Sequence, residues 1–127
     1  MRTRLQPGTR ILARLTLQPS DDDQLQMYLR LGERQIELGS CRGFPEHSEL
    51  QLTDGWAAIA HLRQQRAEVL LVALERGQVV LRAVLEGCSR VGLRLSERML
   101  TIYDDAGRVR SLSLLDGAML MDQRVSP

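Results

Sequence analysis

Hydrophobic and polar residues alternate along this chain in short runs, and turn-forming residues separate one run from the next. Alternation with a period of two is typical of strands that bury one face, and it occurs at residues 11–17, 25–31 and 91–95. Residues 69–74 are apolar at every position, which predicts a central strand covered on both faces. With turn signals roughly every 8 to 12 residues, the pattern predicts an all-β fold. We expect a β-sandwich of about eleven short antiparallel strands, with little or no helix.

Four turn signals indicate where the chain reverses direction. Gly32-Glu33 has glycine at the first central position, as a type II′ hairpin requires. Residues 75–77 end in glycine, which predicts a three-residue loop with a bulge. The DDAG segment at residues 104–107 is the clearest hairpin signal, and Asp116-Gly117 predicts a further turn.

Residues 56–66 are the ambiguous part of the pattern. Local propensity favours a helix capped by Asp54, with Trp56 and Ile59 among its apolar positions. A turn followed by a strand fits the same residues equally well. We expect a strand, because the segments on both sides read as strands.

Composition places the chain among single-domain globular proteins. It has 127 residues, 43% of them hydrophobic, and we expect one domain over residues 1–127, with its core at about 10–122 and frayed termini. The 17 basic and 16 acidic residues give a net charge of +1, which argues against a nucleic-acid or membrane-surface binder. There is no transmembrane-length apolar run and no signal-peptide core, so we expect a cytoplasmic protein that does not insert into a membrane. Cys41 and Cys88 lack a metal-binding spacing and are expected to be reduced, buried thiols.

No standard motif for catalysis, phosphate binding or metal binding is present. We interpret His47 as a surface-loop residue, and His61 as a residue at the core edge whose ring bonds nearby backbone. The remaining candidates are assigned to loops, turns and packing: residues 21–23, Asp104, Asp105, Met119 and Met121. We therefore expect no catalytic residue, no metal site and no cofactor, and a protein that is not an enzyme.

Three segments share their order and spacing with a known recognition motif: IELGS at 36–40, LQLTD at 50–54 and AAIAH at 57–61. Together they resemble the forkhead-associated (FHA) domain, a sandwich of about eleven strands whose loops bind phosphothreonine peptides. In that family a strand ends in Gly-Arg, a later strand is followed by Asp, and the next loop carries Ser, Arg and a structural His. Matches to the motif are Gly39, Asp54 and His61, whereas Ser40, Ala58 and Ile59 replace its Arg, Ser and second Arg. The resemblance covers about residues 10–62.

These replacements imply that the FHA ligand chemistry is lost. Phosphate recognition uses guanidinium forks and hydroxyl donors, and Ala58 and Ile59 supply neither. The resemblance therefore implies a structural corner without phosphothreonine binding, made of Gly39, Ser40, Asp54, Ala58 and His61. The same losses resemble the cytoplasmic N-terminal domains of type III secretion inner-membrane ring proteins, which are scaffolds for other secretion-apparatus subunits. We expect a protein-interaction scaffold, with Trp56 as the candidate partner contact.

Two other functions fit parts of the sequence. A PilZ-like β-barrel that binds cyclic di-GMP would use N-terminal arginines and an Asp-x-Ser-x-x-Gly motif. Residues 40–43 supply Ser-x-x-Gly, but Leu38 takes the Asp position, and the spacing of Arg2, Arg4 and Arg10 differs. An immunity or inhibitor-type protein is the second alternative, since such proteins need only a shaped surface.

Overall fold

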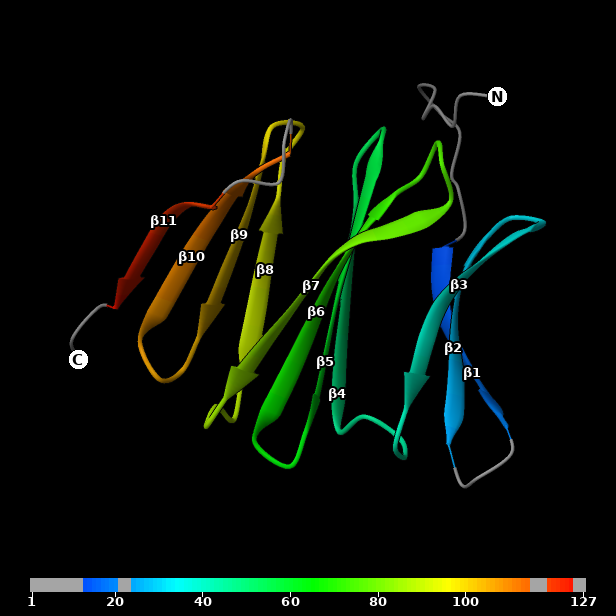
Figure 1. The fold of residues 1–127 in the computed structure, drawn as a ribbon, viewed down its shortest axis with the longest axis horizontal. Helices are drawn as coiled ribbons and strands as arrows, with labels where there is room; N and C mark the ends of the chain where they lie inside the picture. Colours follow the sequence, from blue (N-terminus) through cyan, green and yellow to red (C-terminus); the bar gives the residue numbers. More distant parts are fainter. Residues whose placement is uncertain (1–12, 21–23, 115–118, 125–127) are drawn as a thin grey trace.

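The computed structural model describes residues 13–20, 24–114 and 119–124. Over these residues the chain is all-β, as predicted, with eleven strands in three antiparallel sheets and no helix (Figure 1). The N-terminal sheet contains β1 (Ala13–Pro19), β2 (Leu25–Leu31) and β3 (Arg34–Cys41). The central sheet contains β4 (His47–Leu52), β5 (Trp56–Arg63), β6 (Arg66–Ala73) and β7 (Gln78–Glu86). The C-terminal sheet contains β8 (Val91–Leu95), β9 (Met99–Asp104), β10 (Arg108–Ser113) and β11 (Met119–Arg124).

The central sheet is covered on both faces, so the sandwich has three layers and two cores (Figure 1). Successive residues of a strand point to opposite faces, and β5 follows this rule: Ile59 belongs to the core shared with the N-terminal sheet, and Ala60 to the core shared with the C-terminal sheet. On β6, Leu70 belongs to the core shared with the N-terminal sheet, and Val69 to the core shared with the C-terminal sheet. The prediction that residues 69–74 contain a central strand covered on both faces is confirmed.

The ambiguous segment after Asp54 forms strands, not a helix. β5 and β6 are joined by Gln64-Gln65, with Arg63 paired to Arg66 across a two-residue turn. Both glutamines have positive φ, 54° and 61°, which is the conformation of a type I′ hairpin turn. Such turns usually contain Asn or Gly, because other side chains are strained at positive φ. The sequence therefore carries no signal that predicts this turn.

The other predicted turns are largely confirmed. Gly32 has a φ of 60° and Glu33 is not in the positive-φ region, as a type II′ turn requires. The loop between β6 and β7 has four residues, 74–77, and not the predicted three, and the bulge lies inside the ladder opposite Leu71 and Val72. Residues 104–107 form the predicted hairpin. The predicted turn at Asp116-Gly117 lies outside the described residues.

The described residues contain no helix with the length and apolar character that a membrane crossing requires.

Candidate functional site

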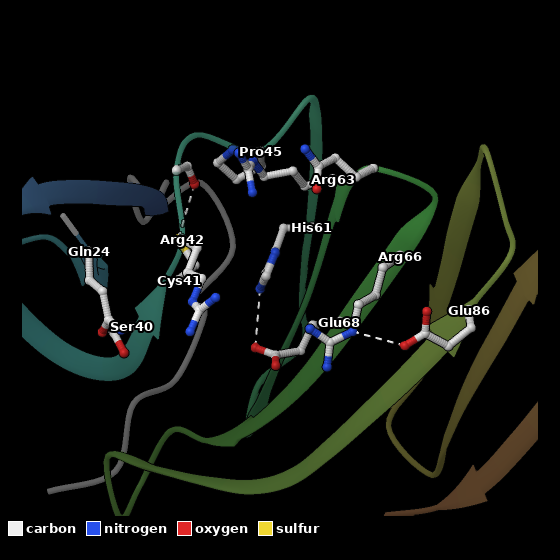
Figure 2. A pocket seen from close by; sticks show the side chains of 12 residues that line it. Gln24, Ser40, Cys41, Arg42, Pro45, His61, Arg63, Arg66, Glu68 and Glu86 are labelled. Atoms are coloured by element: carbon white, nitrogen blue, oxygen red, sulfur yellow. Dashed lines mark hydrogen bonds and ion pairs between the residues drawn. The ribbon is translucent and has the colours of Figure 1, made fainter. Parts of the chain in front are cut away.

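A cavity of about 490 Å³ opens where the end of β3 and the following loop face the central sheet (Figure 2). We call it the arginine cavity, because three arginines contribute to its wall. Its lining residues are Gln24, Ser40, Cys41, Arg42, Gly43, Pro45, His61, Arg63, Gln64, Arg66, Glu68 and Glu86. They come from both sheets, so the folding of the sandwich, and not any single motif, assembles this site.

His61 is buried in the wall of the cavity and is bonded across the sheet to its ladder neighbour. Its Nε2 lies 3.2 Å from Oε1 of Glu68 on β6, and Nη1 of Arg82 on β7 lies 3.3 Å from the same oxygen. The hydrogen bond from His61 holds the pKa of the Glu68 carboxyl below its usual value, against the opposing effect of burial. The expected backbone partner of His61 is therefore corrected: its bonded partner is a carboxylate, because the strand register places Glu68 opposite it.

Arg82 also connects the central sheet to the N-terminal sheet. Its Nη2 donates to the carbonyl oxygen of Leu38 on β3. The same nitrogen lies 2.7 Å from the position that a β-carbon on Gly39 would occupy, and Gly39 has a φ of +118°. The positive φ favours glycine at this position, and a side chain here would also displace the end of Arg82 from Leu38.

Two arginines of the cavity have no ion pair among the described residues. Arg42 follows β3, and Figure 2 shows its guanidinium group directed into the cavity. Arg63 at the end of β5 lies against the loop, with its guanidinium atoms 3.1 Å from the position of a β-carbon on Gly43. By contrast, Arg66 and Glu86 form an exposed ion pair of 3.1 Å at the rim. The cavity therefore carries cationic groups that the described residues leave uncompensated.

The two cysteines lie on opposite sides of the central sheet. Cys88 is buried in the core shared with the C-terminal sheet, whereas Cys41 is half-buried, lines the cavity and packs against the other core. Burial raises the pKa of both thiols, and the charge of Glu68 raises that of Cys41 further. Both are free, as predicted, but the expectation of two buried thiols is corrected for Cys41, because it ends a strand at the cavity.

The predicted recognition corner is not assembled in one place. Ser40 and His61 line the arginine cavity. Asp54 lies in the turn before β5, separated from His61 by roughly 20 Å of extended chain. Ala58 is fully buried in the core on the opposite face of β5. Trp56 is half-buried against that same core, and its role as a partner contact stays a prediction.

The remaining candidates have local roles or lie outside the described part of the chain. His47 is exposed, as a surface residue should be, but it is the first residue of β4 and not a loop residue as expected. Asp104 closes its own hairpin, with Oδ1 accepting from the amides of Ala106 and Arg108 at 3.0 Å. Residues 21–23 and the side chains of Met119 and Met121 are not described. Within the described residues, no group of three His, Cys, Asp or Glu is placed to hold a metal ion.

No protein-family model matches this chain, and a search of curated proteins finds no match either. The resemblance to FHA domains therefore stays a prediction.

Most of the residues that give the cavity its charge carry no signal in the sequence. Arg63, Arg66 and Glu68 look like ordinary exposed positions of strands, and nothing in their spacing marks a site. One signal is present: residues 40–43, which contain part of a dinucleotide-binding motif, line the cavity.

Proposed function

We propose that this protein is a non-catalytic protein-interaction module, and that the outer edge of β7 is its principal contact. The observation that carries the proposal is that, among the described residues, no strand pairs with the side of β7 that faces away from β6. An edge strand offers unpaired backbone donors and acceptors to an incoming chain. The partner would add a strand to the central sheet.

The side chains of β7 favour such pairing. Val80 and Val84 are exposed large apolar residues, 40% and 38% accessible. Edge strands that avoid pairing usually carry lysine, proline or a bulge. β7 has a bulge at Val80, but the six residues from 81 to 86 continue in unbroken register and include neither lysine nor proline. Arg82, the one cation in the strand, is bound to Glu68 and Leu38.

The thiol in the cavity is poorly prepared for catalysis. A nucleophilic cysteine needs a lowered pKa, and burial raises that of Cys41. This feature supports binding without turnover.

The FHA-like motif supports the same class of function, since its phosphate-binding side chains are replaced at Ser40, Ala58 and Ile59. On this proposal the protein is a cytoplasmic scaffold, and the secretion-apparatus subunits suggested by the type III resemblance are its first candidate partners. The free cysteines fit a reducing compartment.

A pair of matched variants tests the proposal. Full-length protein is cross-linked in its source cell, the attached protein is identified by mass spectrometry, and the complex is rebuilt from purified components. Val84→Lys places a charge on the β7 edge and should weaken the measured affinity at least about tenfold. Ser48→Lys, at an exposed position on β4 at the opposite edge of the same sheet, should leave it unchanged. Equal affinity of both variants and the unmodified protein would rule out the β7 contact.

A titration with cyclic di-GMP tests the alternative class of function. The interaction proposal expects no saturable heat in isothermal titration calorimetry. Clear binding, lost in Arg42→Gln, would instead favour a nucleotide-binding module built on residues 40–43.

A further inference from the structure

The charges of the arginine cavity do not cancel. Glu68 is bonded to His61 and Arg82, and Glu86 is paired with Arg66, so both glutamates of the lining are already satisfied. Arg42 and Arg63 have no ion pair or hydrogen bond through their side chains among the described residues. Unpaired guanidinium groups that share a concave surface are suited to a planar oxyanion, which they can bind through two hydrogen bonds each.

The position of these arginines is partly fixed before any ligand arrives. Gly43 has a φ of +91°, and its missing side chain allows the guanidinium of Arg63 to lie directly against the loop. Arg42 precedes this glycine, and its guanidinium group lies in another part of the same cavity, between Ser40 and Glu68 (Figure 2). Burial raises the pKa of the Cys41 thiol most, the charge of Glu68 raises it further and that of Arg63 lowers it.

The rim of the cavity contains the most strained backbone among the described non-glycine residues. Gln64 and Gln65 are the two such residues with positive φ, and Gln64 lines the cavity. Strain of this kind persists where the surroundings hold it, and it gathers at functional sites. Here the backbone amide of Gln64 donates to the carboxylate of Glu46 at 3.2 Å, and the backbone carbonyl of Gln65 accepts from the amide of Gly87 at 2.8 Å. A polar side chain kept at a strained position beside two unpaired arginines is a second indication of a binding site.

We propose that the arginine cavity binds carboxylate through its two unpaired guanidinium groups, those of Arg42 and Arg63, with the side-chain amide of Gln64 as a further donor. A carboxylate fits better than a phosphate dianion, because Glu68 lies in the same wall and repels a second negative charge. Glu86 of β7 also lines the cavity, but the carboxylate site uses side chains of Arg42 and Arg63, whereas the contact proposed above uses the outer backbone edge of β7, so either can exist without the other.

The exposed ring of Phe44 indicates which kind of ligand carries the carboxylate. Phe44 is 70% accessible and does not line the cavity itself, but its neighbours Gly43 and Pro45 do. An exposed aromatic side chain in the loop that carries Arg42 can contact the apolar neighbour of an acidic residue. We therefore expect an acidic peptide to bind more tightly than a free small acid.

Nuclear magnetic resonance titration of the full chain tests the site directly. The probes are sodium acetate, inorganic phosphate, the peptide acetyl-Leu-Glu-Leu-amide and its glutamine analogue. Acetate should shift the Nε–H signals of Arg42 and Arg63 and the amide of Gly43, saturating in the millimolar range. The glutamate peptide should bind more tightly than acetate, and the glutamine analogue should not bind. Glu68→Gln should strengthen acetate binding and admit phosphate.

Matched variants connect the signal to the cavity. Arg42→Gln and Arg63→Gln should each weaken acetate binding about tenfold, as expected for loss of one charge-assisted pair. Arg94→Gln on β8, an exposed arginine away from the cavity, should have no effect. Unchanged thermal unfolding of Arg42→Gln shows that the fold is intact, since this side chain holds no partner among the described residues.

Three results would each overturn the proposal. They are an acetate titration without a saturable shift even well above millimolar concentration, tighter binding of phosphate than of acetate to the unmodified protein, and arginine variants neither of which weakens binding. If acetate and the glutamate peptide bind with equal affinity, the carboxylate site is supported, but an acidic peptide is rejected as its preferred ligand.

Discussion

The ring of Tyr103 covers Gly92 across the ladder between β9 and β8. A β-carbon on Gly92 would overlap three atoms of that ring, and the backbone of Gly92 does not have a positive φ. The ring of Tyr103, and not the backbone conformation, therefore favours glycine at this position. An aromatic side chain lying over a strand glycine shields backbone that glycine alone would leave open.

Gly92→Ala is expected to destabilise the protein by about 0.5–1.5 kcal/mol, because the exposed ring of Tyr103 must turn from its position to admit the methyl group. Urea unfolding at neutral pH measures the change. Gly55→Ala is the matched control, since a β-carbon at Gly55 meets nothing within 4 Å. The explanation fails if Gly92→Ala and Gly55→Ala have the same free energy of unfolding.

Gln51 joins the central sheet to the C-terminal sheet and is predicted to contribute substantially to stability. Its Oε1 accepts from the amide of Leu95 at 2.8 Å, and its Nε2 donates to the carbonyl of Leu93 at 2.5 Å. Gln51→Ala leaves both backbone groups unsatisfied at the junction of two layers, which should cost about 1–3 kcal/mol. Gln26→Ala on β2, whose Nε2 bonds the exposed carboxylate of Glu37 at 2.7 Å, should change the free energy of unfolding far less. Similar losses in both variants would contradict this role.

Most of the fold could be predicted from the sequence, because alternation and glycine turns are local signals. Gly32 and Gly107 mark their hairpins through positive φ, which few other residues adopt readily. The turn at Gln64-Gln65 could not be predicted, since glutamine carries no such preference and tertiary bonds from Glu46 and Gly87 hold it. The doubly buried strand β5 was ambiguous for a different reason: when both faces are apolar, periodicity no longer separates strand from helix.

The candidate site was harder to predict than the fold. The recognition corner was read from residues that are close in sequence, but Ala58 and His61 point to opposite faces of the same strand. The arginine cavity joins Arg42 and Arg63 through the packing of two sheets, which no spacing in the sequence records. Only the register between β5 and β6 shows that His61 meets Glu68.

Acid should weaken the fold through Asp105. Its Oδ1 accepts from the amides of Ser89 at 2.8 Å and Arg90 at 3.1 Å, and these bonds hold the pKa of the carboxyl below its usual value. A lowered pKa in the folded state means that the ionised group stabilises the fold above the unfolded pKa, near 4, and that this contribution is lost as pH falls through the folded pKa. Asp105→Ala should therefore be less stable than the unmodified protein at pH 7, with the difference shrinking as the pH falls below the unfolded pKa and through the lower folded pKa.

Urea unfolding across that pH range measures the effect. Glu97→Ala is the control, because Glu97 is exposed and makes no hydrogen bond or ion pair within the described part of the chain. A stability difference for Asp105→Ala that does not change with pH would show that the carboxylate charge plays no part.

The two thiols should differ in reactivity. Cys88 is 1% exposed in the core, whereas Cys41 is half-buried at the cavity, so iodoacetamide should modify Cys41 first and Cys88 only on unfolding. Because burial raises the pKa of Cys41, its reaction should be slow at pH 7 and accelerate as pH rises above 8. Mass spectrometry of digested samples follows both sites, and Cys41→Ser identifies the fast one. Modification of Cys88 first would place it outside the core.

The strained turn should reveal a conflict between stability and binding. Replacing Gln64-Gln65 by Asn-Gly supplies the residues that a type I′ turn prefers, and should raise the free energy of unfolding by about 1 kcal/mol. The same change shortens the side chain at position 64 by one methylene and draws its amide back from the arginine cavity, so acetate binding should weaken while the protein becomes more stable. Urea unfolding and the acetate titration measure the two effects on one sample. Glu33→Gly is the control, since Glu33 is not at positive φ and the change should bring no gain. An Asn-Gly variant that is no more stable than the unmodified protein would show that the glutamine turn carries no strain, and the reason for a binding role of Gln64 would then be lost.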